Sequence, residues 1–155
     1  MPDIKPIPDG YPRVSPHLSV VGASKAIDFY KDVLGATERM RMGAPGGGIA
    51  HAEIQVGDSV IMIGEEMPGG TDPSPQTLGG SPVALFVYVE DVDEVFRRAV
   101  EAGAHTVSEP ELHFYGDRVA TIDDPFGHRW NLATHVEDLS PEDMERRAAE
   151  AMSSP

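Results

Sequence analysis

Residues 115–135 read YGDRVATIDDPFGHRWNLATH, and this stretch decides the fold because it describes two strands joined by a tight turn. Apolar and polar residues alternate on both sides of the DPFG segment at 124–127, and a period of two gives each strand two different faces. Pro125 presets φ for a turn, the Asp124 side chain can bond its own backbone, and Gly127 tolerates positive φ. The stretch therefore predicts a hairpin.

The two faces of this hairpin differ in character. A packed core accepts a guanidinium, an amide or an imidazole only when each is hydrogen-bonded, so we expect the face that carries them to line a cavity. The expected core face carries Val119, Thr121, Trp130 and Leu132, and the expected polar face carries Arg118, Arg129, Asn131 and His135.

The first half of the chain shows the same kinds of pattern. A short amphipathic helix is expected from Ser24, as its N-cap, to Gly35, where glycine releases the chain. Alternation of apolar residues predicts strands at 14–21, 37–42, 51–56 and 59–64.

The second half repeats this order after a loop rich in Gly and Pro. A strand is expected at 82–89, a helix with an acidic first turn at 91–103, a strand around Thr106, and then the hairpin. Residues 21–36 align without a gap with residues 89–104, which indicates an internal duplication. The expected organisation is a Pro-rich arm (1–13), a first βαβββ module (14–66), a linker (67–80), a second βαβββ module (81–136) and a C-terminal helix and tail (137–155).

Composition excludes several classes of partner and site. The chain has 155 residues, a net charge of −14 and no cysteine. An acidic protein does not suit nucleic acid or an anionic membrane surface, and without cysteine there is no disulfide or thiolate metal site. The N-terminal segment does not resemble a signal peptide and no stretch reaches membrane-spanning length, so we expect a cytoplasmic protein.

Three segments carry a resemblance to a known family: AIDFYKDVLGA (26–36), VEDVDEVFRRAVEAGA (89–104) and GDRVATIDDPFGHRWNLATH (116–135). They resemble the glyoxalase/bleomycin-resistance/extradiol-dioxygenase superfamily, the vicinal oxygen chelate proteins, and are most similar to its PhnB-like branch. The resemblance implies an α+β fold in which two βαβββ modules form a curved mixed sheet with a concave cavity and helices on the outer face. It also implies a homodimer. Fold alone does not settle function.

The resemblance also bears on metal binding. Metal-using members carry one ligand on the first and one on the fourth strand of each module, and the motif alignments place these positions at Ser15, Ile61, Ala84 and Asn131. None of these is a histidine or a carboxylate, which a divalent ion held by N and O donors usually requires. We therefore expect no metal cofactor. The alternative is Ni, Zn, Mn or Fe held by a shifted ligand set that includes His17 or Glu65.

Alternation alone selects the residues of a candidate small-molecule site. His51 and Glu53 lie two apart on one strand face and can form the imidazole–carboxylate pair that a general base needs. A purely structural pair is the competing interpretation. Phe86 and Tyr88 suit stacking on a flat ligand, whereas Arg118 can instead close a salt bridge with Asp117 or Asp124. The candidate catalytic residues are His17, His51 and Glu53, and the candidate ligand-binding residues are Gln55, Glu65, Phe86, Tyr88, Arg118 and Asn131.

The sequence thus predicts a protein that binds a small organic molecule between βαβββ modules without a metal. It would either sequester a toxic or secondary metabolite or convert it. A divalent-metal lyase, isomerase or dioxygenase with a shifted ligand set is the alternative, and a structural or regulatory dimer without a ligand is a third possibility.

Overall fold

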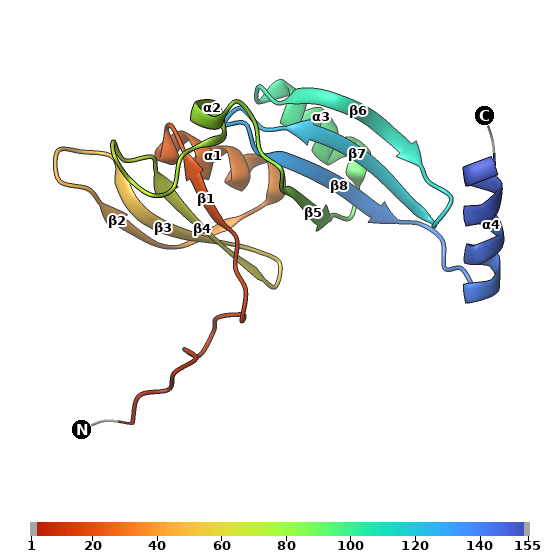
Figure 1. Cartoon of the computed structure of the whole chain (residues 1–155), viewed down its shortest axis with the longest axis horizontal. Helices are drawn as coiled ribbons and strands as arrows, with labels where there is room; N and C mark the ends of the chain where they lie inside the picture. The colour runs from red at the N-terminus through yellow and green to blue at the C-terminus, as the bar shows by residue number, and fades with distance from the viewer. Residues whose placement is uncertain (1–2, 154–155) are drawn as a thin grey trace. The chain divides into compact units, whose positions relative to one another are not determined.

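A computed structural model describes residues 3–153 of the chain, which divides into two compact units, residues 1–80 and 81–155 (Figure 1). Each unit contains a βαβββ sequence of elements and its own four-stranded mixed sheet, so the predicted α+β class is confirmed. The outermost residues of the predicted arm and tail, 1–2 and 154–155, lie outside the described residues. No helix within 3–153 is both long and apolar enough to cross a lipid bilayer.

The first unit builds its sheet in the order β1-β4-β3-β2, with β1 parallel to β4 and the other pairs antiparallel. Its elements are β1 (His17–Val20), α1 (Ala23–Leu34), β2 (Thr37–Gly43), β3 (Ile49–Val56), β4 (Ser59–Glu65) and the single-turn α2 (Pro75–Leu78).

Helix α1 covers one face of this sheet and makes the core of the unit. Its buried residues recur every three or four positions, which is the spacing of one helix face. On the sheet side, Leu18 pairs with Ile63 and Ile63 pairs with Ala52, and all three are buried. The helix ends as expected at Gly35, which has φ +66° and donates its N–H to the Tyr30 carbonyl.

The start of α1 differs from the expectation. Ser24 lies inside the helix and the N-cap is Gly22, whose backbone is left-handed. The cap comes instead from Glu65, because its two carboxylate oxygens accept hydrogen bonds of 2.7 Å from the N–H groups of Gly22 and Ala23. A carboxylate at the positive end of a helix stabilises it through both the hydrogen bonds and the dipole.

The second unit builds its sheet in the order β5-β8-β7-β6, with β5 parallel to β8. Its elements are β5 (Ala84–Tyr88), α3 (Val92–Glu101), β6 (His105–Leu112), β7 (Asp117–Asp123), β8 (Arg129–His135) and α4 (Pro141–Ser153). Asp91 caps α3 by accepting from the N–H of Glu94, and Ser140 does the same for α4 with Asp143.

The predicted hairpin at 115–135 is present as β7 and β8. Asp124 holds its turn: one carboxylate oxygen accepts from the N–H groups of Phe126 and His128, and the other accepts from the indole of Trp130 at 2.9 Å. Asp124 and Trp130 are both buried. The turn is therefore fixed to the core by the chain's only tryptophan.

The register of this hairpin corrects the expected faces. Val119 pairs with Ala133 and Thr121 pairs with Asn131. Directly opposite residues of an antiparallel pair point to the same face, so Val119 and Thr121 share the face of Asn131 and not the face of Trp130 and Leu132, although Val119 is itself buried. Arg118 pairs with Thr134 and lies on the helix side of the sheet, so the prediction that it faces the polar side was wrong.

Candidate functional site

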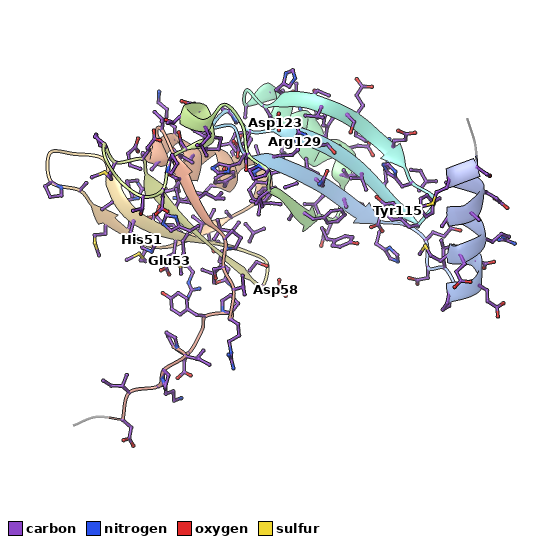
Figure 2. The ribbon with its side chains drawn as sticks, in the orientation of Figure 1. His51, Glu53, Asp58, Tyr115, Asp123 and Arg129 are labelled. Atoms are coloured by element: carbon purple, nitrogen blue, oxygen red, sulfur yellow. The ribbon has the colours of Figure 1, made fainter. Side chains whose placement is uncertain are left out.

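The polar face of the first sheet brings together the three residues that the sequence proposes as catalytic. Glu53 on β3 pairs with Met62 on β4, which in turn pairs with His17 on β1. Glu53, Met62 and His17 therefore form a row across the sheet. His51 precedes Glu53 by two positions and therefore lies on the same face (Figure 2). We call His17, His51 and Glu53 the first-sheet site.

Glu53 is the centre of this site. Its side chain is only 8% exposed, yet it is held by two polar partners. The Tyr11 hydroxyl donates to Oε1 at 2.6 Å, and His51 Nε2 lies 3.1 Å from Oε2. These contacts lower the pKa of the Glu53 carboxyl, the Tyr11 hydrogen bond most strongly, although burial opposes them. Glu53 is therefore ionised at neutral pH.

The ionised carboxylate determines which ring nitrogen of His51 acts as the donor. A carboxylate only accepts hydrogen bonds, so the contact with His51 requires the proton on Nε2. A neutral His51 then keeps Nδ1 as an acceptor. Its side chain is 30% exposed, which leaves the ring accessible from solvent.

His17 and His51 stack on each other, with ring centroids 5.9 Å apart and planes 18° from parallel. Gly64 makes room for this arrangement. A Cβ at position 64 would lie 3.4 Å from His17 Cε1 and 3.2 Å from the Ala50 carbonyl oxygen. A side chain at this position would thus press on the β3 backbone beside His51 and touch the His17 ring.

Other residues proposed from the sequence are used elsewhere in the first unit. Gln55 lies on the same face but donates to the carbonyl of Gly57 at the nearby turn. Glu65 pairs with Val20 on the opposite, helix-covered face and caps α1. The prediction that Glu65 faces the site was therefore wrong, because its strand has the opposite phase to the one assumed.

The loop after β4 contributes a separate feature. Ser19, on the polar side of β1, donates to the Asp72 carbonyl at 2.6 Å and ties this loop to the sheet. Glu66 accepts from the Ser74 N–H and from the Thr77 hydroxyl. A surface pocket of about 340 Å³ lies within the loop, but its lining residues belong to 66–77 and include none of the proposed site residues.

In the second unit, Tyr88 joins a second buried carboxylate. Its hydroxyl donates to Asp117 Oδ2 at 2.8 Å, and His135 Nδ1 lies 2.7 Å from Oδ1 of the same residue. His135 Nε2 lies 2.7 Å from Asp138. The neighbouring carboxylates, Asp138 first and then Asp117, raise the pKa of His135.

The remaining candidates lie around this group. The ring centroids of Phe86 and Tyr88 are 5.2 Å apart, and the two residues are 49% and 61% exposed to solvent. Asn131 pairs with Phe86 and accepts from the Thr121 hydroxyl at 2.7 Å. Two further polar residues of the same face, Arg129 and Asp123, form an ion pair (Figure 2).

Arg118 does not join this face. Its guanidinium makes a bidentate pair with Asp93 of α3, at 2.9 and 2.8 Å. Asp93, not Asp117 or Asp124, is therefore its partner. The contact fastens the helix to β7.

The residues at the family's metal-ligand positions do not fit a divalent ion. Ile61 is buried in the core, Ala84 has no donor atom, and the Asn131 side-chain oxygen accepts a threonine hydroxyl. Ser15 offers one hydroxyl, which is buried and has no hydrogen-bond partner among the described residues. Within 3–153 no three His, Asp or Glu side chains gather in a way that could hold a metal ion.

Sequence reasoning missed Tyr11 and Arg39. Arg39 Cζ lies 4.6 Å from the centroid of the Tyr11 ring, which in turn reaches Glu53. Tyr11 belongs to the Pro-rich arm, whose composition predicts an extended segment that lies on the body or on a neighbouring subunit without indicating which residue makes the contact. A single aromatic residue in such an arm was the available signal.

Comparison with known proteins covers most of the chain. A model of the Glyoxalase/Bleomycin resistance protein/Dioxygenase superfamily matches residues 14–132. The uncharacterized protein Mb0911c of Mycobacterium bovis is 38% identical over 137 residues, which are 86% of this chain and 90% of that protein. A lactoylglutathione lyase of Neisseria meningitidis is 29% identical over 113 residues, 72% of this chain and 82% of the lyase.

Solved structures show the same fold. TioX from Micromonospora sp. ML1 has a TM-score of 0.62 and 26% identity, over 81% of this chain and 99% of its own. The PhnB protein from Bacillus cereus has a TM-score of 0.63 and 15% identity, over 79% and 99%. The second likeness concerns the fold alone.

Proposed function

The chain belongs to the Glyoxalase/Bleomycin resistance protein/Dioxygenase superfamily, and we propose that it binds a small organic molecule at the first-sheet site without a metal ion. The observation that carries this proposal is the Glu53 carboxylate, ionised and nearly buried between a tyrosine hydroxyl and an imidazole. A buried charge is costly unless it is paired or hydrogen-bonded, so its retention beside two stacked histidines suits a recognition centre.

The pKa of Glu53 argues against proton abstraction as long as Tyr11 is hydrogen-bonded to it. A general base works best when its pKa lies near the working pH, whereas the Tyr11 hydrogen bond lowers the pKa of Glu53. With Tyr11 in place, Glu53 is a hydrogen-bond acceptor more than a base. Sequestration is therefore the first form of the proposal, and conversion through His17, His51 and Glu53 is the second.

The aromatic face of the second unit is proposed, by itself, as a second ligand-binding surface. Phe86 and Tyr88 present exposed rings that can stack on a flat molecule, and Asn131 lies beside them in the sheet. Arg118 is not included because its guanidinium is paired with Asp93.

The competing function is a divalent-metal enzyme, and the similarity to a lactoylglutathione lyase favours it. The residues at the expected ligand positions do not supply a suitable donor set, so we keep the metal-free form. Elemental analysis of protein purified without chelator, followed by titration with Ni, Zn, Mn and Fe, separates the two. Tightly held stoichiometric metal would overturn the metal-free proposal.

A thermal-shift screen of flat aromatic metabolites on metal-stripped protein tests binding itself. A ligand that binds only the folded state must raise Tm. We expect a hit to raise Tm for the wild type and to lose most of that effect in Glu53→Gln. Glu38→Gln, a matched change at a carboxylate paired with Arg41, should keep it. A rise that survives in Glu53→Gln, or that appears only with added metal, contradicts the proposal.

A homodimer in the cytoplasm completes the proposal. Light scattering after size-exclusion chromatography tests the dimer, and fractionation of the source cells tests the location. A monomer at working concentration would contradict the first of these.

A further inference from the structure

The N-terminal arm touches the site through one side chain. Residues 3–10 and 12–14 are exposed, with Ile4 82% and Val14 84% accessible, whereas Tyr11 is half-buried. An ion pair between Lys5 and Asp9 stays within the arm. The arm leads into β1 in Figure 1, and Tyr11 is the residue that fastens it to the sheet.

Tyr11 makes two polar contacts at the first-sheet site. Its hydroxyl gives a 2.6 Å hydrogen bond to the Glu53 carboxylate, and its ring lies under the Arg39 guanidinium at 4.6 Å. One contact is a charge-assisted hydrogen bond and the other is a cation–π contact. Together they define a half-buried place shaped for a hydroxylated aromatic ring.

This arrangement leaves one group unsatisfied. Arg39 Nη1 is buried and has no hydrogen-bond partner among the described residues. An unpaired buried donor is unfavourable, so the tyrosine ring is not the best occupant of this place. A ring that carries an acceptor oxygen in addition to its hydroxyl would satisfy both groups. Its acceptor oxygen would accept from Arg39 Nη1, and its hydroxyl would donate to Glu53.

We infer that Tyr11 is a built-in competitor, and that the ligand is a hydroxyaromatic compound whose phenolic group replaces that of Tyr11 on Glu53. This inference rests on the proposed function, since it names the ligand class and the control of the same site. The arm closes the site when the ligand is absent. Binding displaces Tyr11 and frees the arm.

A simple anchor gives different results from a competitor. If Tyr11 only fastens the arm, its removal leaves the affinity of the site for phenols unchanged. If Tyr11 occupies the site, the measured affinity is reduced by the fraction of molecules in which the site is closed, and removing the ring restores it.

The first experiment titrates 4-nitrophenol, which carries a hydroxyl and acceptor oxygens, into wild type, Tyr11→Ala, Tyr11→Phe and Tyr115→Phe at about pH 5.5, where the phenol keeps its proton and Glu53 is ionised. 4-Nitroanisole, which lacks the hydroxyl, is the control ligand. We expect Tyr11→Ala to bind 4-nitrophenol about tenfold more tightly than the wild type, because a hydrogen bond to a charged group no longer competes. The affinity of Tyr11→Phe should lie between those of the wild type and Tyr11→Ala. Tyr115→Phe, the matched change elsewhere, should have the affinity of the wild type.

The second experiment reads the arm directly by limited trypsin digestion. Lys5 precedes proline and is resistant, so Arg13 before Val14 is the bond that reports release of the arm. Saturating 4-nitrophenol should speed this cleavage in the wild type. Tyr11→Ala should be cut rapidly with or without the compound, because cleavage follows the population of the open form.

The outcomes separate failure of this inference from failure of the proposed function. Equal affinity in wild type and Tyr11→Ala, with cleavage unchanged, overturns the competitor and leaves the proposed function standing. If 4-nitroanisole binds as tightly as 4-nitrophenol, or if hits without a hydroxyl bind and still need Glu53, only the ligand class is overturned. If no compound binds the wild type or Tyr11→Ala in a way that depends on Glu53, both this inference and the proposed function are overturned.

Discussion

Tyr11 and Glu53 lie 42 positions apart in the sequence, and the tyrosine hydroxyl donates a 2.6 Å hydrogen bond to the nearly buried carboxylate. This contact is the largest cause of the lowered pKa of Glu53. Tyr11→Phe should therefore raise that pKa toward its ordinary value. A pH titration of the Glu53 side-chain carboxyl carbon by NMR measures it, with Tyr115→Phe as the control. An unchanged pKa in Tyr11→Phe would show that the contact does not form in solution.

The same pair predicts the pH dependence of stability. A carboxyl whose folded-state pKa is lowered contributes stability that is present above its unfolded pKa and lost as pH falls through the folded pKa. Tyr11→Phe should thus destabilise the protein more at about pH 7 than at about pH 3, because this contribution declines as pH falls below the unfolded pKa toward the lowered folded pKa. Urea unfolding at the two pH values measures the difference, and an equal loss at both would contradict the assignment.

Glu65 should act on the stability of the first unit. Glu65→Ala removes two hydrogen bonds of 2.7 Å at the start of α1 and the favourable charge at that end. We expect a loss of about 1–2 kcal/mol in the free energy of unfolding, measured with urea. An equivalent change at exposed Glu109 is the control and should cost little. If Glu65→Ala instead abolished ligand binding at unchanged stability, Glu65 would be a ligand contact as the sequence suggested.

Gly64 should act on the site more than on the fold. In Gly64→Ala the new methyl group lies 3.2 Å from the Ala50 carbonyl oxygen and also touches His17 Cε1 at 3.4 Å. The β3 backbone beside His51 must therefore give way by a few tenths of an ångström, which disturbs the stack of His51 on His17. We expect a stability cost of about 1 kcal/mol and an affinity for an aromatic hit that falls about fivefold. Gly43→Ala is the matched control, since its Cβ meets its nearest neighbour, the Gly48 carbonyl oxygen, at 3.9 Å. Equal affinities in the two variants would argue against a role for the stacked ring.

His135 should give the second unit the opposite pH dependence. Its pKa is raised by Asp138 and Asp117, so its contribution to stability is full below the unfolded pKa and is lost as pH rises through the folded pKa. Wild type should therefore exceed His135→Gln in stability at about pH 5.5, and the gap should close by about pH 9. A gap that widens with pH would reverse the assignment.

The fold was largely predictable because its signals are local and repeated. Alternation located the strands, the DPFG turn located the hairpin, and Gly35 located the end of α1. The shared face of His51 and Glu53 also followed from alternation, because side chains two apart on a strand share a face whatever the register. The pairing of β1 and β3 with β4 brings His17 to the same face.

The wrong or missing predictions concern side chains whose orientation or partner depends on pairing between segments that are distant in the sequence. The phase of β4 decides whether Glu65 faces the site or the helix, and a shift of one residue reverses it. Arg118 found Asp93 on α3, a partner 25 positions away, and Tyr11 found Glu53 from an arm without periodicity. Neither contact has a local signature.

The central claim is that an organic ligand binds at His17, His51 and Glu53, and the imidazole rings report on it directly. The chain has six histidines, of which His51 touches Glu53 and His135 touches Asp117. Long-range proton–nitrogen NMR spectra of the rings, recorded during titration with a screening hit, should shift His17 and His51 in parallel with saturation. The shifts should disappear in Glu53→Gln. Saturation that leaves both rings unmoved would place the ligand elsewhere and contradict the account.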